Sequence, residues 1–255
     1  MPDYDADCRA CFNPTSRLSP EEQIECCSRV IDADRQSAEV ERAYFARGLN
    51  RADFVGDLQG AIDDYTSAIA RSERGEYLQS RGDAYMLLGN GDAALADFAR
   101  VAELDPAAAY PHFSMGGVYE WQKDDHAAVR CYSRAIDLSP EWATPYLCRS
   151  RIFVALGEAK AARQDLDKAI ELDPENPVYR AGRAISALRD GHADKALSDL
   201  NVAVDLEPDL AVLLYLRSRA RLRLGHMAAA EVDLAAAREL QPDIVEEMAK
   251  EGAEF

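Results

Sequence analysis

The chain has 255 residues, 48% of them hydrophobic, which is enough apolar material for a folded protein. Its 29 Lys and Arg stand against 46 Asp and Glu, and a formal net charge of −17 repels phosphate backbones and anionic headgroups. These numbers argue against nucleic acid and membrane surfaces as partners. No apolar run reaches the roughly 18 residues needed to span a bilayer.

The chain opens with MPDYDADCRACFNPTS, which has no basic start followed by an apolar run. Such an opening predicts no export signal and a cytoplasmic protein. A trimmed start would instead leave the bacterial periplasm open as the location.

Four cysteines crowd the first 27 residues: Cys8, Cys11, Cys26 and Cys27. Cys26 and Cys27 are neighbours on a predicted helix and point about 100° apart, which argues against a tetrahedral zinc site. A redox pair at Cys8 and Cys11 would need an adjoining strand and helix, and neither is predicted. Two alternatives remain: free thiols, or a disulfide from Cys8 or Cys11 to Cys26 or Cys27. Such a disulfide would close a loop of about 15 to 20 residues and contribute about 3 kcal/mol to stability.

The segment SPEEQIECCSRVID, residues 19–32, predicts a helix. Ser19 is a good N-cap, Pro20 suits the first helical position, and Glu22 completes a capping box. We expect a lone helix here, covering the open end of the array that follows.

A 34-residue period organises the chain after this helix. Five prolines mark it, each closing a phrase such as AELDP or IELDP: Pro106, Pro140, Pro174, Pro208 and Pro242. Twelve residues before each proline stands an alanine, and eight residues before it a large apolar side chain, so both lie on one face of a helix.

An earlier helix completes each repeat. In four repeats it ends at a glycine 17 residues before the proline, the expected left-handed helix terminator, while the third repeat has Lys123 there. Small residues at Gly82 and Gly116, with aromatic residues nearby, allow the two helices to approach to about 8 to 10 Å. Each repeat is thus predicted to be a helix-turn-helix pair.

This pattern resembles the tetratricopeptide repeat family, in a bacterial-type form. The resemblance implies an all-α solenoid, a right-handed superhelix of antiparallel helix pairs. We expect a cysteine-rich segment and capping half-repeat over 1–40, six repeats over 41–242, and an acidic capping helix over 243–255. The repeat bounds are 41–74, 75–108, 109–142, 143–176, 177–210 and 211–242, the first with one extra residue in its turn.

Two slots of the repeat change together. The first helix carries an arginine in five repeats: Arg47, Arg81, Arg149, Arg183 and Arg217. The second helix carries an aspartate in the same five: Asp64, Asp97, Asp165, Asp199 and Asp233. The third repeat replaces both, with Met115 and Cys131. Because a buried charge without its partner costs several kcal/mol, we predict that the slots form structural ion pairs rather than an anion site.

The concave side of such an array is the expected binding surface, and the first helices line it. The candidate peptide-binding residues are Phe113, Trp121, Leu147, Arg151, Ile185, Arg189, Arg219 and Arg223. The apolar members would bury a ligand, and the arginines would select an acidic stretch or a C-terminal carboxylate. Packing between repeats and ordinary surface pairing are the competing interpretation of these residues. The Lys, Asn and Arg set with which some family members bind chaperone tails is replaced, for example, by Leu49, Ser80 and Tyr110.

No nucleophile elbow, phosphate loop, dinucleotide fingerprint or zinc-protease motif occurs, and the repeats leave too little chain for a catalytic domain. The four histidines fall in turns or begin a helix, so no metal and no cofactor are predicted. The expected function is therefore non-catalytic binding of another protein or peptide by a monomer. A self-associating structural component is the alternative, and RNA reading by a related repeat class is the least favoured.

Overall fold

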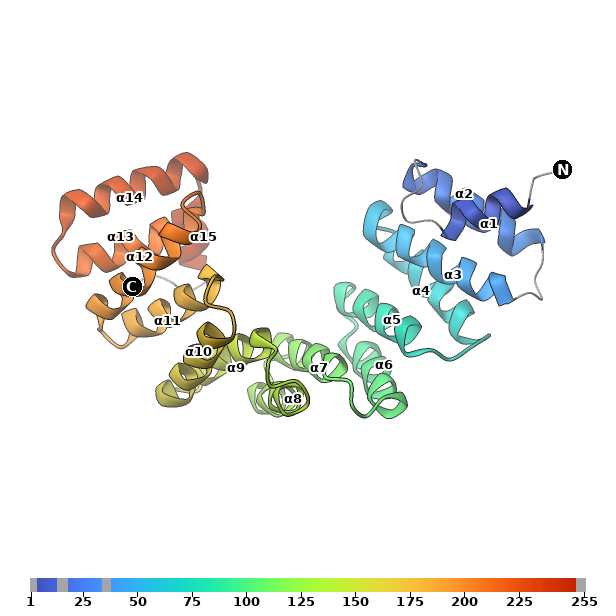
Figure 1. Cartoon of the computed structure of the whole chain (residues 1–255), viewed down its shortest axis with the longest axis horizontal. Coiled ribbons are helices and arrows are strands. Elements are labelled where there is room, and N and C mark those ends of the chain that lie inside the picture. The colour runs from blue at the N-terminus through green and yellow to red at the C-terminus, as the bar shows by residue number, and fades with distance from the viewer. Residues whose placement is uncertain (1–3, 13–17, 34–37, 251–255) are drawn as a thin grey trace. The chain divides into compact units, whose positions relative to one another are not determined.

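The computed structural model describes residues 4–12, 18–33 and 38–250, and within these ranges the chain forms helices and no strands (Figure 1). It divides into two compact units, residues 1–138 and 139–255. The boundary follows the third repeat. Both units are built from the predicted helix pairs, and each is described by itself.

The first unit contains three repeats behind an N-terminal hairpin. Its helices are α1 (Tyr4–Phe12), α2 (Pro20–Ala33), α3 (Ala38–Asn50), the π-helix η1 (Arg51–Val55), α4 (Leu58–Ile69), α5 (Gly75–Leu87), α6 (Gly91–Leu104), α7 (Tyr110–Trp121) and α8 (Asp125–Leu138). Each first helix packs on its own second helix, and each second helix packs on the first helix of the next repeat.

The second unit contains the other three repeats and a short final helix. Its helices are α9 (Ala143–Ala155), α10 (Ala159–Leu172), α11 (Pro177–Arg189), α12 (Ala193–Leu206), α13 (Ala211–Arg223), α14 (Met227–Leu240) and α15 (Ile244–Lys250). In α15, Ile244 and Met248 are buried, and the helix packs mainly on α13. The last five residues of the predicted capping helix, 251–255, lie outside the described part of the chain.

The turn inside each repeat is formed by the residue that ends the first helix. Gly89, Gly157, Gly191 and Gly225 have φ near +80°, the left-handed conformation that ends a helix. Lys123 adopts the same conformation, with φ of 63°, which a side chain with a Cβ tolerates less well. The extra residue of the first repeat is accommodated by η1, which ends at Gly56 with φ of 74°.

The core of a repeat is the seam between its two helices. Ala94 and Phe98 of α6 are fully buried, and a Cβ built on Gly82 of α5 would lie 2.5 Å from the Phe98 ring. Glycine is therefore needed at residue 82 for the aromatic ring to fit.

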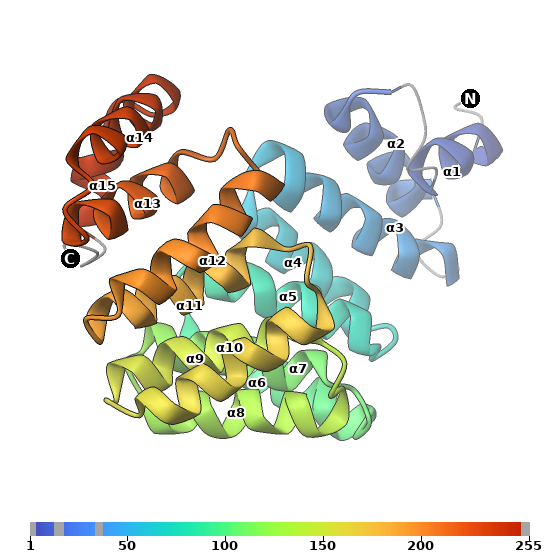
Figure 2. The ribbon, with the colours of Figure 1, turned by 60° about the vertical axis from the view of Figure 1, so that its left-hand side comes forward.

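The N-terminal segment differs from the expected lone helix. The capping box of α2 is present, because the Ser19 backbone N–H donates to the Glu22 carboxylate at 2.7 Å and the Glu22 N–H donates to Ser19 Oγ at 3.2 Å. However, Tyr4–Phe12 also folds, as α1, and packs on α2 (Figure 2). The predicted helix is thus one arm of a hairpin.

Candidate functional site

The arginine and aspartate slots of the repeats are in contact in all five cases. Each guanidinium donates through Nε and Nη2 to the two carboxylate oxygens of its partner, at 2.6–2.9 Å. The pairs are Arg47–Asp64, Arg81–Asp97, Arg149–Asp165, Arg183–Asp199 and Arg217–Asp233. These aspartates are buried, so the arginines neutralise charges inside the scaffold.

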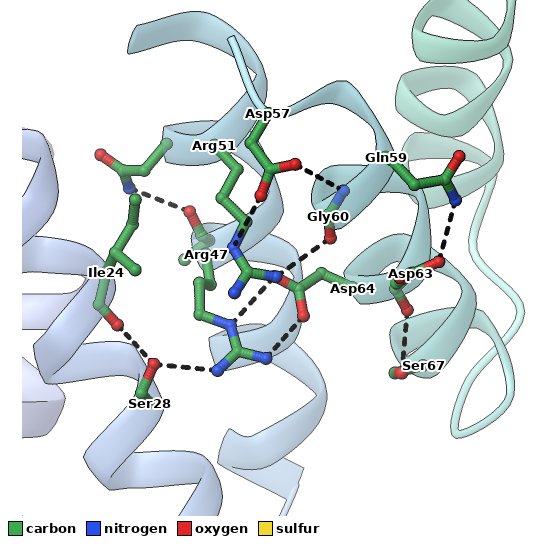
Figure 3. Close-up of polar contacts among 12 residues, drawn as sticks. Ile24, Ser28, Arg47, Arg51, Asp57, Gln59, Gly60, Asp63, Asp64 and Ser67 are labelled. Atoms are coloured by element: carbon green, nitrogen blue, oxygen red, sulfur yellow. Dashed lines mark hydrogen bonds and ion pairs between the residues drawn. The ribbon is translucent and has the colours of Figure 1, made fainter. Parts of the chain in front are cut away.

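Several of these arginines also reach the preceding second helix. Arg47 Nη1 donates to Ser28 Oγ at 2.9 Å, and Ser28 donates to the Ile24 carbonyl, which ties α3 to α2 (Figure 3). Arg81 Nη1 donates to Thr66 Oγ1 of α4 at 3.0 Å in the same way. The slot therefore fastens neighbouring repeats together as well as closing its own repeat.

The first and last repeats add a second arginine to the pair. Asp64 accepts a further bond from Arg51 Nη1 at 2.9 Å (Figure 3), and Asp233 accepts one from Arg221 Nη1 at 2.7 Å. The third repeat has neither charge. There Met115 packs against the core around Phe98, and burial raises the pKa of the Cys131 thiol.

The N-terminal hairpin carries a disulfide between Cys11 of α1 and Cys27 of α2, with a Cα–Cα distance of 4.9 Å. Cys26 is buried and accepts a hydrogen bond from Arg29 Nη2 at 3.1 Å. The side chain of Cys8 lies outside the described part of the chain. One of the pairings that the sequence left open is therefore present.

The two candidate aromatic residues of the third repeat differ in exposure. Phe113 is half-buried, and its ring centroid lies 5.7 Å from that of Tyr132, so it belongs partly to the seam of its own repeat. Trp121 is 61% exposed at the end of α7, and it is within van der Waals reach of Gly89. Of the two, only Trp121 is largely exposed to solvent.

The candidates of the second unit are not gathered at one point. Leu147 packs near Gly182 of the next repeat, and Ile185 packs against the buried core. Arg151 and Arg189 are exposed on α9 and α11, and Arg219 is half-buried on α13. Arg223 is exposed at the end of α13 and donates to the Leu188 carbonyl at 2.6 Å, which caps the end of α11.

A cleft of about 590 Å³ opens in the first unit, where α1, α3 and α5 lie together. We call it the α3 cleft. Its apolar lining consists of Cys11, Phe12, Phe45, Ala46, Leu49, Phe54 and Tyr77. Its polar lining consists of Gln23, Arg42, Asn50, Asp53, Arg74 and Glu76.

One face of α3 and η1 supplies the floor of the cleft. Arg42, Phe45, Leu49, Asn50 and Asp53 recur at helical spacing, so they form a stripe with a cation at one end and a carboxylate at the other. The stripe is about 16 Å long, from the rise of an α-helix. Such a stripe presents apolar contact area between two opposite charges.

The walls hold the floor in position. The Phe45 ring lies 4.5 Å from that of Tyr77, and the Tyr77 hydroxyl donates to Glu41 at 2.8 Å. Burial, and then the bond to Glu41, raise the pKa of Tyr77 to about 12, so it remains a hydrogen-bond donor at neutral pH. Arg42 lies 4.6 Å over the Phe12 ring, which brings α1 against the cleft.

Asn50 is the buried polar group of the cleft. Its Nδ2 donates to the Ala46 carbonyl at 2.9 Å, while its Oδ1 is buried and has no hydrogen-bond partner. Sequence reasoning missed this cleft because the first repeat was assigned to the scaffold and α1 was not predicted. The helical spacing of Arg42, Phe45 and Leu49 was the available signal.

The second unit has a smaller cleft of about 330 Å³, lined chiefly by Arg163, Asp167, Arg183, Lys195 and Asp199. Arg183 already binds both aspartates. Among the described residues, no group of three or more His, Cys, Asp or Glu is arranged to hold a metal ion, and no helix is long and apolar enough to cross a membrane.

The family model of the tetratricopeptide repeat matches residues 75–107 and 145–176. These are the second and fourth repeats, whose helix pairs and ion pairs are described above. The chain is a tetratricopeptide-repeat protein. Comparison with curated proteins found no match.

Solved structures of tetratricopeptide-repeat proteins share the fold. One from Parabacteroides merdae is 17% identical, with a TM-score of 0.75, and the match covers 97% of each chain. YrrB, a tetratricopeptide-repeat protein with an unusual peptide-binding site, is 22% identical with a TM-score of 0.56, over 73% of this chain and 97% of its own. MamA is 23% identical with a TM-score of 0.58, over 68% and 94%.

Proposed function

We propose that this chain is a non-catalytic binding protein that holds a segment of another protein in the α3 cleft. The observation that carries the proposal is the cleft itself, with its apolar floor of Phe45 and Leu49 open to solvent between α1 and α5. Such a site suits a peptide, because aromatic and aliphatic walls supply burial and a few placed polar groups supply orientation.

The dimensions of the floor suggest an extended segment. The stripe from Arg42 to Asp53 spans about 16 Å, the length of about five residues of extended chain. Arg42 would attract an acidic residue at one end, and Asp53 a basic residue at the other. Asn50 lies between them in the lining of the cleft.

The fold comparison supports binding as the class of function. Tetratricopeptide-repeat proteins bind other proteins or peptides, and YrrB has a peptide-binding site on the same fold. We extend peptide binding to this chain as part of the proposal. The particular site is argued only from the residues of the α3 cleft.

The test uses short random peptides displayed on phage and selected on the full chain. Synthetic copies of the selected peptides are then titrated by fluorescence anisotropy. Phe54→Ser, at the exposed mouth of the cleft, should weaken binding about tenfold, because an aromatic contact is lost. Val232→Ser is the matched control, since Val232 is equally exposed on α14 and does not line the cleft. Equal affinities for the two variants would remove the cleft as the site.

Two exposed arginines of the second unit give the proposal a second contact. Arg151 and Arg189 are exposed on successive first helices, where an acidic stretch or a C-terminal carboxylate of the partner would bind. Arg189→Glu should weaken peptides that end in an acidic residue and leave their amidated, neutral versions unchanged. An equal effect on both versions would contradict this contact.

Self-association is the second candidate, and exposed apolar residues on the last repeat favour it. Met227 is 61% and Val232 68% exposed, both on α14. Stacking of such faces would join copies end to end. Light scattering over a concentration series separates the candidates: a constant monomer mass contradicts assembly, and a rising mass that Val232→Glu abolishes supports it.

We also propose an oxidising compartment, such as the bacterial periplasm, over the cytoplasm. The disulfide between Cys11 and Cys27 supports this, because disulfides persist mainly outside reducing compartments. Intact-mass measurement of protein from the native cell, alkylated before and after reduction, tests it. Full alkylation without reductant would contradict it.

A further inference from the structure

One half-buried carboxylate in the first unit lacks the partner that the buried aspartates of the repeats have. Asp83 lies on α5, and within the described chain no Lys or Arg forms an ion pair with it. By contrast, Asp97 of the same repeat binds Arg81 through both oxygens. Burial raises the pKa of Asp83, and the hydrogen bond from Gln79 only partly opposes this. The ionised group is thus poorly compensated by the protein.

Gln79, one turn before Asp83, adds a second acceptor. Its Nε2 donates to Asp83 Oδ1 at 3.2 Å and lies 3.3 Å from Ser114 Oγ of α7. Its Oε1 is buried and has no hydrogen-bond partner. Among the described residues, Gln79 Oε1 therefore lacks a donor, and Asp83 has an uncharged amide donor but no cation, so both groups keep acceptor capacity that a cationic donor could fill.

An aromatic ring stands beside these acceptors. Tyr110 of α7 is partly exposed, and it shares a hydrogen bond with Ser114. Burial, and then the charge of Asp83, raise the pKa of the Tyr110 phenol. Ser114 links the ring to the acceptors, because it shares hydrogen bonds with both Tyr110 and Gln79. Carboxylates and aromatic rings both attract organic cations.

We propose that Asp83, Gln79 and Tyr110 form a subsite for an arginine side chain of the bound partner. The planar guanidinium has five N–H donors, enough to satisfy both the Asp83 carboxylate and Gln79 Oε1, and its face stacks on an aromatic ring. Helix α5 also supplies Glu76 to the α3 cleft, and Glu76, Gln79 and Asp83 follow one another along α5 at helical spacing. The inference rests on the proposed function, since the arginine belongs to the segment held there.

The subsite is tested first without any peptide. N-acetyl-arginine methylamide is titrated into isotope-labelled full chain, and the side-chain amide signal of Gln79 is followed by NMR. We expect a saturable shift, and affinity at least about tenfold lower for the uncharged analogue N-acetyl-citrulline methylamide. Equal responses to the two probes, or no response of Gln79 to the arginine probe, would overturn the proposal.

Variants assign the effect to the carboxylate. Asp83→Asn keeps the shape of the side chain and should lower affinity for the arginine probe about tenfold, whereas Asp92→Asn, an equal charge change at an exposed residue of α6, should not. Gln79→Leu provides a second variant that removes the other acceptor. Retained affinity in both Asp83→Asn and Gln79→Leu would contradict the subsite.

The two proposals fail separately. Phe54→Ser alters the mouth of the α3 cleft and should leave binding of the arginine probe unchanged. If selected peptides ignore Phe54→Ser while the probe still needs Asp83, the cleft is wrong and the subsite stands. If peptides need Phe54 but show no preference for arginine over citrulline, the subsite is wrong and the cleft stands.

Discussion

The two compact units use one repeat but close its seam with different side chains. In residues 1–138, a glycine of the first helix meets an aromatic ring of the second: Gly48 with Tyr65, Gly82 with Phe98, and Gly116 with Tyr132. In residues 139–255, the same two slots hold Ser150 with Leu166, Ala184 with Leu200, and Ser218 with Leu234. Side-chain volume is thus redistributed across the seam, which preserves dense packing.

The exposed ends of the first helices differ more strongly between the units. In the first unit they carry Phe54, Leu87 and Trp121, which are 69%, 69% and 61% exposed. In the second unit the corresponding residues are Ala155, Arg189 and Arg223. No packing requirement explains exposed aromatic and aliphatic residues, so the comparison shows that the units share a scaffold and differ in the surface exposed at the ends of their first helices.

The ion pairs give the largest expected effect on this comparison. Arg81→Met leaves the buried Asp97 without its guanidinium and should lower the free energy of unfolding by about 3 to 5 kcal/mol. Arg217→Met should cost less, because Arg221 still binds Asp233. Urea unfolding measures both variants. Arg81→Met/Asp97→Cys copies the third repeat and should recover most of the loss; a double variant no more stable than Arg81→Met would contradict the pairing argument.

The second-largest effect is expected from reducing the disulfide, which should destabilise the first unit and not the second. Reduction of Cys11–Cys27 removes a crosslink over a loop of 16 residues, worth about 3 kcal/mol. Hydrogen exchange followed by mass spectrometry should show faster exchange in α1, α2 and α3, with α11 to α15 unchanged. Cys27→Ser is expected to match the reduced protein. Uniform acceleration in both units would show that the units do not unfold independently.

The seam itself gives a smaller effect. Gly82→Ser introduces the residue type of the second unit, and its Cβ would lie 2.5 Å from the Phe98 ring, so we expect a loss of about 1 to 3 kcal/mol in thermal or urea unfolding. Gly82→Ser/Phe98→Leu recreates the second-unit pair and should be more stable than Gly82→Ser alone. A further loss in the double variant would contradict the exchange of volume across the seam.

The smallest effect concerns Asp83. Because burial raises its pKa in the folded state, the ionised carboxylate opposes folding above its unfolded value of 3.8, and this penalty disappears as the pH falls through the raised pKa. Asp83→Asn should therefore stabilise the chain slightly at neutral pH and not at low pH. Urea unfolding across this pH range measures the difference. A variant less stable than wild type at neutral pH would argue that Asp83 is structural.

The scaffold was largely predictable because it repeats. Several features of the sequence indicate the same helix pair. They are the prolines at a fixed period, the alanines at a fixed slot, and the joint loss of Arg and Asp in the third repeat. The left-handed conformation of Lys123 followed from its slot rather than from its residue type. Redundancy of this kind compensates for weak local signals.

The cleft was less predictable because it depends on parts that do not repeat. Helix α1 has no counterpart in the 34-residue pattern, and without it Phe12 and Cys11 provide no wall. The hydrogen bond from Arg223 to the end of α11 was likewise absent from the repeat pattern. Exposure and cap geometry at single residues are set by tertiary contacts that periodicity does not encode.

The π-helix η1 has an evolutionary consequence. It absorbs one additional residue between α3 and α4 while the Arg47–Asp64 pair on either side remains closed. A one-residue deletion there would change which side chain stands at the mouth of the cleft without disturbing the interior. The lining of the α3 cleft can therefore change through insertion and deletion as well as through substitution.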